Sequence, residues 1–151
     1  MSDTPENFAA PARLSPSRLT AEVKRRAREL GFEKVGVVRA EALTQERARL
    51  EEWLRRGNHA SMAWMGRGVE RRTDPRELLP GARTVVAVAL NYFTPHEHAR
   101  EEGRGKISRY AWGDDYHDVV GEKLKNLLAW IRQEWPGADG KVCCDIELPL
   151  P

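Results

Sequence analysis

Residues 82–93, with the sequence ARTVVAVALNYF, are the most strongly β-prone stretch of the chain. Every position from Val85 to Leu90 is apolar, so both alternating faces of the predicted strand are apolar. This pattern is typical of a central strand that is covered on both faces. Asn91 and Tyr92 follow, where α/β sheets usually contact ligands. The stretch therefore predicts an α/β fold and directs attention to its carboxyl end.

Further elements are expected on either side of this strand. They are a helix over 17–30, a strand over Lys34–Arg39, a helix over 44–56, a helix from 114 or 115 to about 135, and a strand over Lys141–Ile146. Gly31 and Gly57 follow the first two predicted helices, where a C-cap in the left-handed conformation favours glycine. The expected N-caps are Thr44 for the second helix and either Asp114 or Asp115 for the last helix. We predict one layered α/β domain over 17–151, with a mixed sheet flanked by helices, after a disordered lead-in over 1–16.

The composition bounds the class of protein. A chain of 151 residues can bury one real core, and its net charge of +2 does not by itself indicate nucleic-acid binding. No apolar run approaches the roughly 20 residues of a membrane span, and the first residues lack the core of a signal peptide. The two cysteines, Cys143 and Cys144, are adjacent, so we do not expect a disulfide between them. The absence of an expected disulfide favours a cytoplasmic location.

Residues 106–118, KISRYAWGDDYHD, concentrate the chemistry of the chain. They hold two phenols, an indole, an imidazole, two cations and three carboxylates, directly before the best helical pattern. This density of hydrogen-bonding groups beside an apolar run predicts one wall of a cofactor pocket. Asp145 lies within or just after the last predicted strand, and it either caps the next turn or is a buried, protonated acid suited to donating a proton.

Two other segments leave alternatives open. Met62, Trp64 and Met65 lie between glycines and are followed by basic residues, either as a loop that plugs the core or as an apolar lid with a cationic rim for a large amphipathic ligand. His96 and His98 lie in a polar loop over 94–105 without a matching third ligand, so no metal site is expected there. No CxxC motif occurs, so the chain encodes no cluster ligands.

The motifs together resemble one family. They are GFEKVGVVRA at 31–40, the Met–Trp–Met segment, RRTDPRELLPGARTVVAVALNY at 71–92, GKISRYAWGDDYHDVVGEKLK at 105–125, and VCCD at 142–145. The series resembles the N-terminal portion of epoxyqueuosine reductases, over about residues 19–145. The resemblance implies a cobalamin-dependent iron–sulfur oxidoreductase that reduces epoxyqueuosine to queuosine in tRNA. In that family a later ferredoxin-like part carries two [4Fe–4S] clusters.

The resemblance also implies roles for particular residues. Asp145 resembles the family's proton donor, and Asp115 and Tyr116 resemble the polar pair that lines the active site. The cobalamin contacts that the resemblance suggests are Arg72, Ser108, Arg109 and Asp145. Reducing an epoxide to an alkene removes oxygen as water, so a neutral Asp145 would protonate the leaving oxygen.

The last residues depart from the family, because after Asp145 the chain continues only as IELPLP. We therefore expect an incomplete catalytic domain, inactive by itself, that ends before the ferredoxin-like part; an incomplete chain, a shifted reading frame or a split gene would each explain this. The expected partners of a cytoplasmic, monomeric protein are tRNA that carries epoxyqueuosine and an electron donor, with no membrane.

Two alternatives remain. One is a non-enzymatic remnant that binds tRNA through Arg67, Arg71, Arg72 and Arg109. The other is a flavin-type reductase domain, because an α/β pocket with aromatic side chains also suits a flavin.

Overall fold

The computed structural model describes residues 15–98 and 103–144. Its longer elements are the helices α1 (Pro16–Glu29), α2 (Thr44–Arg55), α3 (Val69–Thr73) and α4 (Tyr116–Glu134), and the strands β1 (Lys34–Arg39) and β2 (Thr84–Ala89). Three short 3-10 helices are η1 (Ala63–Gly66), η2 (Pro75–Glu77) and η3 (Arg109–Ala111). Among the described residues, no helix is both long and apolar enough to cross a membrane. Residues 1–14 of the predicted lead-in and Asp145 lie outside the described residues.

Local signals explain where the first and last helices begin and end. The Ser15 hydroxyl accepts a hydrogen bond from the Arg18 backbone N–H and so caps α1, and Gly31 follows its C-cap at φ +92°. The Asp115 carboxylate caps α4 by accepting from the His117 backbone N–H. Thr44 was expected to cap the second helix, but it is the first helical residue, and no side-chain hydrogen bond caps α2. The cap prediction is therefore confirmed for Asp115 and wrong for Thr44.

The sheet consists of β1 and β2, which pair antiparallel from Lys34 opposite Ala89 to Arg39 opposite Thr84. The α/β class is confirmed. The central position predicted for Val85–Leu90 is wrong for the described residues, because β2 has one neighbour and its side chains are half-buried or exposed. Residues 141–144 of the predicted last strand form no strand. Apolar side chains on both faces of β2 thus remain partly uncovered by the described part of the chain.

A small core joins α1, α4 and one face of the sheet. Ala27 of α1, Phe32 and Leu127 of α4 are buried in contact with one another. The partly buried side chains that pack around them are Leu30, Val35, Val86, Val88, Leu90, Val120, Leu124, Trp130 and Ile131. Phe32 is 2% exposed and is the largest fully buried side chain. The core therefore lies at one end of the sheet and holds α4 in place.

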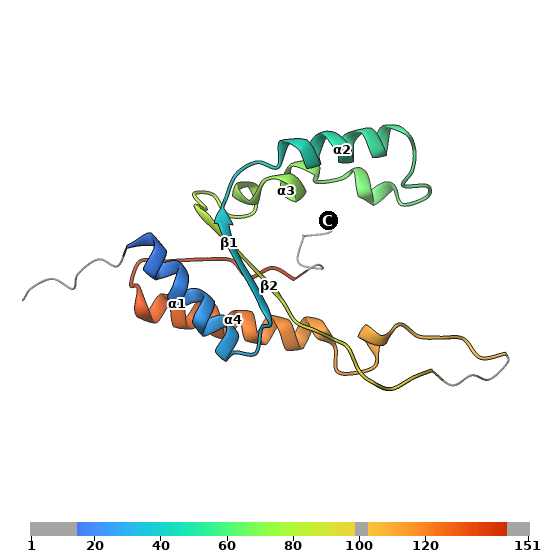
Figure 1. Cartoon of the computed structure of the whole chain (residues 1–151). Coiled ribbons are helices and arrows are strands. Elements are labelled where there is room, and N and C mark those ends of the chain that lie inside the picture. Colours follow the sequence, from blue (N-terminus) through green and yellow to red (C-terminus); the bar gives the residue numbers. More distant parts are fainter. Residues whose placement is uncertain (1–14, 99–102, 145–151) are drawn as a thin grey trace, which may run out of the picture.

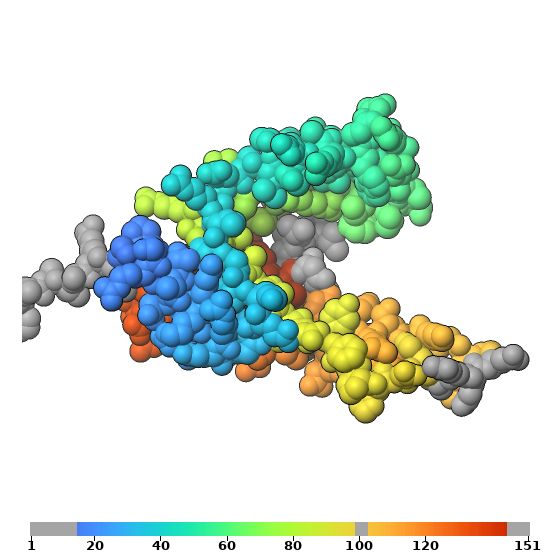
Figure 2. All heavy atoms as spheres, viewed as in Figure 1, coloured from blue at the N-terminus to red at the C-terminus, as the bar shows by residue number. Residues whose placement is uncertain are grey.

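Two extensions project from this core (Figure 1). The α2–α3 arm, residues 44–77, lies beyond one end of the strands, where an Arg47–Glu70 ion pair of 3.0 Å links its two helices. The aromatic arm, residues 92–98 and 103–112, runs out from the other end and returns to α4. In the space-filling view of Figure 2, the described residues of the two arms are separated by a gap, referred to below as the hollow. The chain therefore presents two separated surfaces toward one hollow.

Candidate functional site

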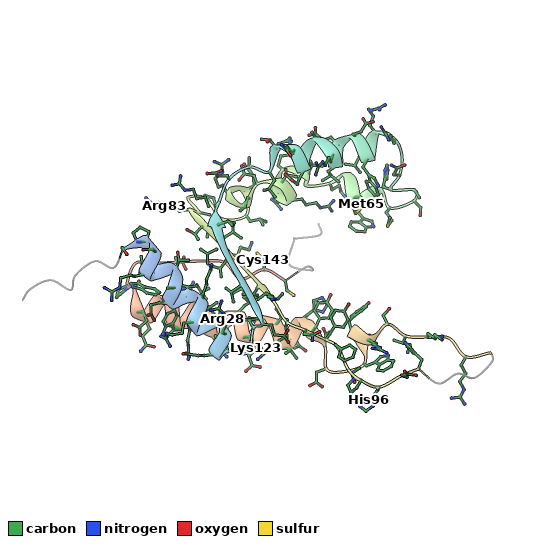
Figure 3. All side chains as sticks on the ribbon, in the orientation of Figure 1. Arg28, Met65, Arg83, His96, Lys123 and Cys143 are labelled. Atoms are coloured by element: carbon green, nitrogen blue, oxygen red, sulfur yellow. The ribbon has the colours of Figure 1, made fainter. Side chains whose placement is uncertain are left out.

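Arg72 fastens the Met–Trp–Met segment to α3. Its Nη1 donates to the Met65 carbonyl oxygen at 2.6 Å, and its guanidinium carbon lies 5.6 Å from the centre of the Trp64 ring. Its other N–H groups make no hydrogen bond to the described residues. Figure 3 places Met65 on the side of the α2–α3 arm that faces the hollow. Arg72 thus combines a structural contact with donors that are available to a ligand.

The Met–Trp–Met segment is built by short-range hydrogen bonds. Backbone bonds of 2.9 Å join Met62 to His59 and Met65 to Met62, and Gly57 and Ala60 have positive φ values of 70° and 48°. Met62 and Trp64 are each 41% exposed, so within the described residues the segment does not plug the core. Of the two predicted interpretations, an apolar surface with a cationic rim agrees better with this exposure.

The aromatic arm is organised by Arg109, the half-buried residue that follows Ser108. Its guanidinium carbon lies 5.4 Å from the Phe93 ring centre and 5.9 Å from the Trp112 ring centre, and Nη1 donates to the Thr94 carbonyl at 3.3 Å. These contacts tie the outgoing and returning segments of the arm together. Ser108 precedes η3 and is exposed, and its carbonyl accepts from the Ala111 N–H at 3.0 Å.

His96 and His98 both lie in the aromatic arm, at different positions in its packing. The His98 ring packs edge-on against the Trp112 ring at 4.6 Å, and His96 is an exposed residue of the aromatic arm. The described residues contain no group of three His, Cys, Asp or Glu side chains that could hold a metal ion. His98 therefore helps to form the aromatic arm.

The first turn of α4 brings four polar or aromatic side chains together. Asp115 Oδ1 accepts from the His117 backbone N–H at 2.9 Å and lies 2.6 Å from His117 Nδ1. The Tyr116 ring lies 3.9 Å from the His117 ring and packs edge-on against Tyr110 at 5.9 Å. The pKa of the Asp115 carboxyl is below its ordinary value, because the backbone N–H and then the ring of His117 donate hydrogen bonds to it. Asp115 is therefore ionised near neutral pH.

The structure unites some of the predicted site residues and separates others. Arg109, Asp115 and Tyr116 lie in or beside the aromatic arm, together with Ser108, whereas Arg72 lies in the α2–α3 arm across the hollow. A depression of about 450 Å³ occurs elsewhere, between α1 and the sheet, and contains none of these residues. Sequence reasoning did not single out His117 or Trp112, although both belong to the quoted stretch 106–118. The only feature of the sequence that could have pointed to these two residues is their closeness along the chain to Asp115 and Arg109.

Comparison with known proteins finds, over most of the chain, the family that the sequence motifs resemble. The family described as "Epoxyqueuosine reductase QueG, DUF1730" matches residues 72–146. The epoxyqueuosine reductase of Gloeobacter violaceus is 48% identical over 118 residues, which are 78% of this chain and 36% of the relative. That of Atelocyanobacterium thalassa is 41% identical over 115 residues, which are 75% of this chain and 37% of the relative.

Solved structures agree with the sequence relatives. An epoxyqueuosine reductase from Bacillus subtilis, with an aspartate-bearing catalytic loop swung out of its active site, superposes with a TM-score of 0.70 at 30% identity and covers 80% of this chain and 33% of its own. A reductase with an epoxyqueuosine-modified tRNA stem loop gives 0.69 at 30% identity, covering 79% and 32%.

The fold is thus that of an α/β domain, of which residues 72–146 match the DUF1730 family. The chain belongs to the epoxyqueuosine reductase family, a family of oxidoreductases, and spans about two fifths of the length of the curated relatives it matches.

Proposed function

We propose that the chain is the cobalamin- and substrate-binding part of an epoxyqueuosine reductase, which reduces epoxyqueuosine to queuosine in tRNA. The observation that carries the proposal is that each arm of this family member bears exposed apolar or aromatic side chains together with an arginine. The complete reductase would work in the cytoplasm as a monomer and receive its electrons from a separate donor through iron–sulfur clusters.

The exposed side chains fit a corrin. Cobalamin has a broad apolar macrocycle with amide groups at its rim and a tail that carries a phosphate. Exposed apolar side chains line both arms; they are Met62 and Trp64 on the α2–α3 arm, and Tyr92, Phe93, Ile107 and Tyr110 on the aromatic arm. Arg72 has N–H groups that make no hydrogen bond to the described residues, and Arg109 and Ser108 add a cation and a hydroxyl on the aromatic arm. We propose Arg72, Ser108, Arg109 and Asp145 as the residues that hold the cofactor.

The bound cofactor would supply low-potential electrons for breaking a carbon–oxygen bond. The residues of the chain would orient the modified base and control its protons. Asp145 is proposed as the acid that protonates the leaving oxygen, and Asp115 and Tyr116 as the polar pair that lines the base. A solved relative has an aspartate on a catalytic loop, which supports an aspartate in this role.

The cysteines of this chain do not fit a [4Fe–4S] cluster. Such clusters take four thiolates, whereas the chain has two cysteines, which are adjacent. No step is therefore assigned to a cluster bound by these residues. The clusters of the complete reductase would lie outside the part of the family that the chain spans.

The test is cobalamin binding, followed by corrin absorbance. Addition of the 151-residue chain to cobalamin should shift the corrin bands, and Arg72→Gln should weaken this response at least about tenfold, because a ligand contact and the Trp64 support are lost together. Arg71→Gln is the matched control, because Arg71 precedes Arg72 on the same helix and its side chain is exposed. Absence of any shift up to millimolar cobalamin would contradict the proposal for this chain.

The Asp145 role has its own test in the complete reductase. Asp145→Asn should bind cobalamin with unchanged absorbance and lose turnover by about 100-fold or more, because the amide cannot donate a proton of comparable acidity. Turnover equal to that of the parent would remove Asp145 from the donor role.

Unpaired cations favour a second candidate function, tRNA binding without catalysis. Arg67 and Arg71 are exposed and form no ion pair with the described residues, and their neighbour Arg72 lies over the ring of the exposed Trp64. Arginine beside an exposed aromatic ring suits a phosphate backbone with a stacked base. This candidate predicts tRNA binding by the chain in the absence of cobalamin, with an affinity that falls as salt rises. A salt-independent affinity would argue against it.

A further inference from the structure

Asp115 and His117 form a dyad at the start of α4. The same Asp115 oxygen accepts the His117 backbone N–H at 2.9 Å and lies 2.6 Å from the Nδ1 atom of the ring. The His117 side chain is 25% exposed, with its Nε2 atom buried, whereas the side chain of Asp115 is 61% exposed. The capping residue of the helix therefore also fixes the orientation of the imidazole two residues later.

The geometry determines which ring nitrogen carries hydrogen. An ionised carboxylate has only acceptors, so a contact of 2.6 Å requires a hydrogen on His117 Nδ1. The Nε2 atom is then the position at which the ring gains or loses a proton. The Tyr116 ring at 3.9 Å and the edge of Tyr110 behind it limit the rotation of the imidazole.

The proposed reaction needs two protons. An epoxide, two electrons and two protons give an alkene and one water molecule. When the first carbon–oxygen bond breaks, the oxygen takes one proton and becomes a hydroxyl group. When the second bond breaks and the double bond forms, the departing oxygen takes the other proton and leaves as water. A single carboxylic acid delivers one proton, so the second proton comes either from a second acid or after solvent has reprotonated the first.

We propose that His117, through Nε2, supplies the second proton of epoxide reduction, and that Asp115 is the positioning residue of His117. The inference rests on the proposed function. Within that function, it assigns Asp115 to positioning His117. An ionised Asp115 is a poor donor, whereas an imidazole held by a carboxylate is a general acid near neutral pH. The two electrons would come from the reduced cofactor, and the external donor of the complete reductase would then reduce the cofactor again.

The first test uses turnover of epoxyqueuosine tRNA by the complete reductase. His117→Gln keeps a side-chain N–H for Asp115 but cannot transfer a proton, so we expect kcat to fall by about 100-fold or more. The control is His96→Gln, which changes an exposed histidine of the aromatic arm. Corrin absorbance of each variant reports the cofactor site separately. If the parent enzyme turns over and His117→Gln retains at least half of kcat, the inference is overturned, while the proposed function stands.

Chemical rescue separates proton transfer from a structural role. His117→Ala leaves space for added imidazole, and we expect substituted imidazoles to restore turnover in proportion to their acidity. Turnover that stays low at every imidazole concentration, with cobalamin absorbance intact, would overturn the proton role.

A spectroscopic test requires no turnover. Histidine-labelled 151-residue chain has only four histidines to assign. Long-range ¹H–¹⁵N spectra should show His117 protonated at Nδ1, and Asp115→Ser should remove this preference, because serine still caps α4 but lacks the carboxylate. An Nε2–H tautomer in the parent would contradict the positioning role of Asp115.

Discussion

The contact between Lys123 and the end of α1 predicts a measurable coupling between two residues far apart in the sequence. Lys123 Nζ donates to the Leu30 carbonyl at 2.6 Å, at the C-cap of α1. A methyl group added at Gly31 would lie 3.0 Å from the same Nζ atom. Since α4 also carries Asp115 and His117, this contact holds the helix that positions the candidate site.

The magnitudes follow from the two perturbations. Lys123→Met removes a half-buried, charge-assisted hydrogen bond and a favourable charge at a helix C-terminus, together about 2 kcal/mol. Gly31→Ala costs about 1.5 kcal/mol because φ is +92°, and it also displaces Nζ, for a total of about 3.5 kcal/mol. If both variants remove the same Nζ contact, the double variant should lose only about 3.5 kcal/mol of the free energy of unfolding. If their effects were independent, the losses of the two single variants would add to about 5.5 kcal/mol.

Urea unfolding followed by circular dichroism measures these free energies, provided that the slope with denaturant stays constant. Lys125→Met, an exposed position of the same helix, is the control and should change stability by less than about 0.5 kcal/mol. Additivity of the two variants within about 0.5 kcal/mol would refute the displacement of Nζ by Gly31→Ala. A loss of less than about 0.5 kcal/mol in Lys123→Met would refute the stabilising contact between Nζ and the end of α1.

Two further predictions concern the core and the pH dependence of stability. Phe32→Ala should destabilise the chain by about 3–5 kcal/mol, measured in the same urea experiment, whereas Phe93→Ala, at a position 67% exposed, should have little effect on unfolding. The Asp74 carboxyl accepts from the side chain and backbone of Arg76, which lowers its pKa to about 2. The stability that its ionised form contributes is complete above its unfolded pKa of about 4 and is lost as the pH falls toward 2, so the advantage of the parent over Asp74→Asn should shrink over that range.

Much of the local structure could be predicted because its causes are local. Gly31 and Gly57 have the positive φ values that their places after two helices require, and Asp115 caps α4. Thr44 was a plausible cap, yet the chain enters α2 one residue earlier, with Leu43 at the cap position. Capping depends on how the preceding segment approaches, and Leu43 is bonded through its N–H to the Thr73 carbonyl at 2.7 Å, a tertiary contact.

The sheet and the site show where prediction from sequence stops. The apolar pattern of Val85–Leu90 indicates that both faces of a strand avoid water, but it does not identify the segment that covers each face. In the described residues β1 is the neighbour of β2, and α1 and α4 supply the packing. Within the stretch 106–118, η3 and the first turn of α4 meet through the rings of Tyr110 and Tyr116. That this stretch forms one wall of a cofactor pocket stays a prediction.

The sequence itself determined the family, the α/β class, the glycines that follow α1 and α2, and the Asp115 cap of α4. The reason is that motifs, these caps and periodicity are properties of neighbours along the chain. Only the tertiary structure decided that Arg72 stands across a hollow from Ser108 and Arg109, and that Lys123 of α4 donates to the Leu30 carbonyl at the end of α1. The physical reason is that such relations depend on packing between distant segments. A residue pattern specifies which side chains must be buried or paired, whereas their partners are chosen when helices and strands pack together.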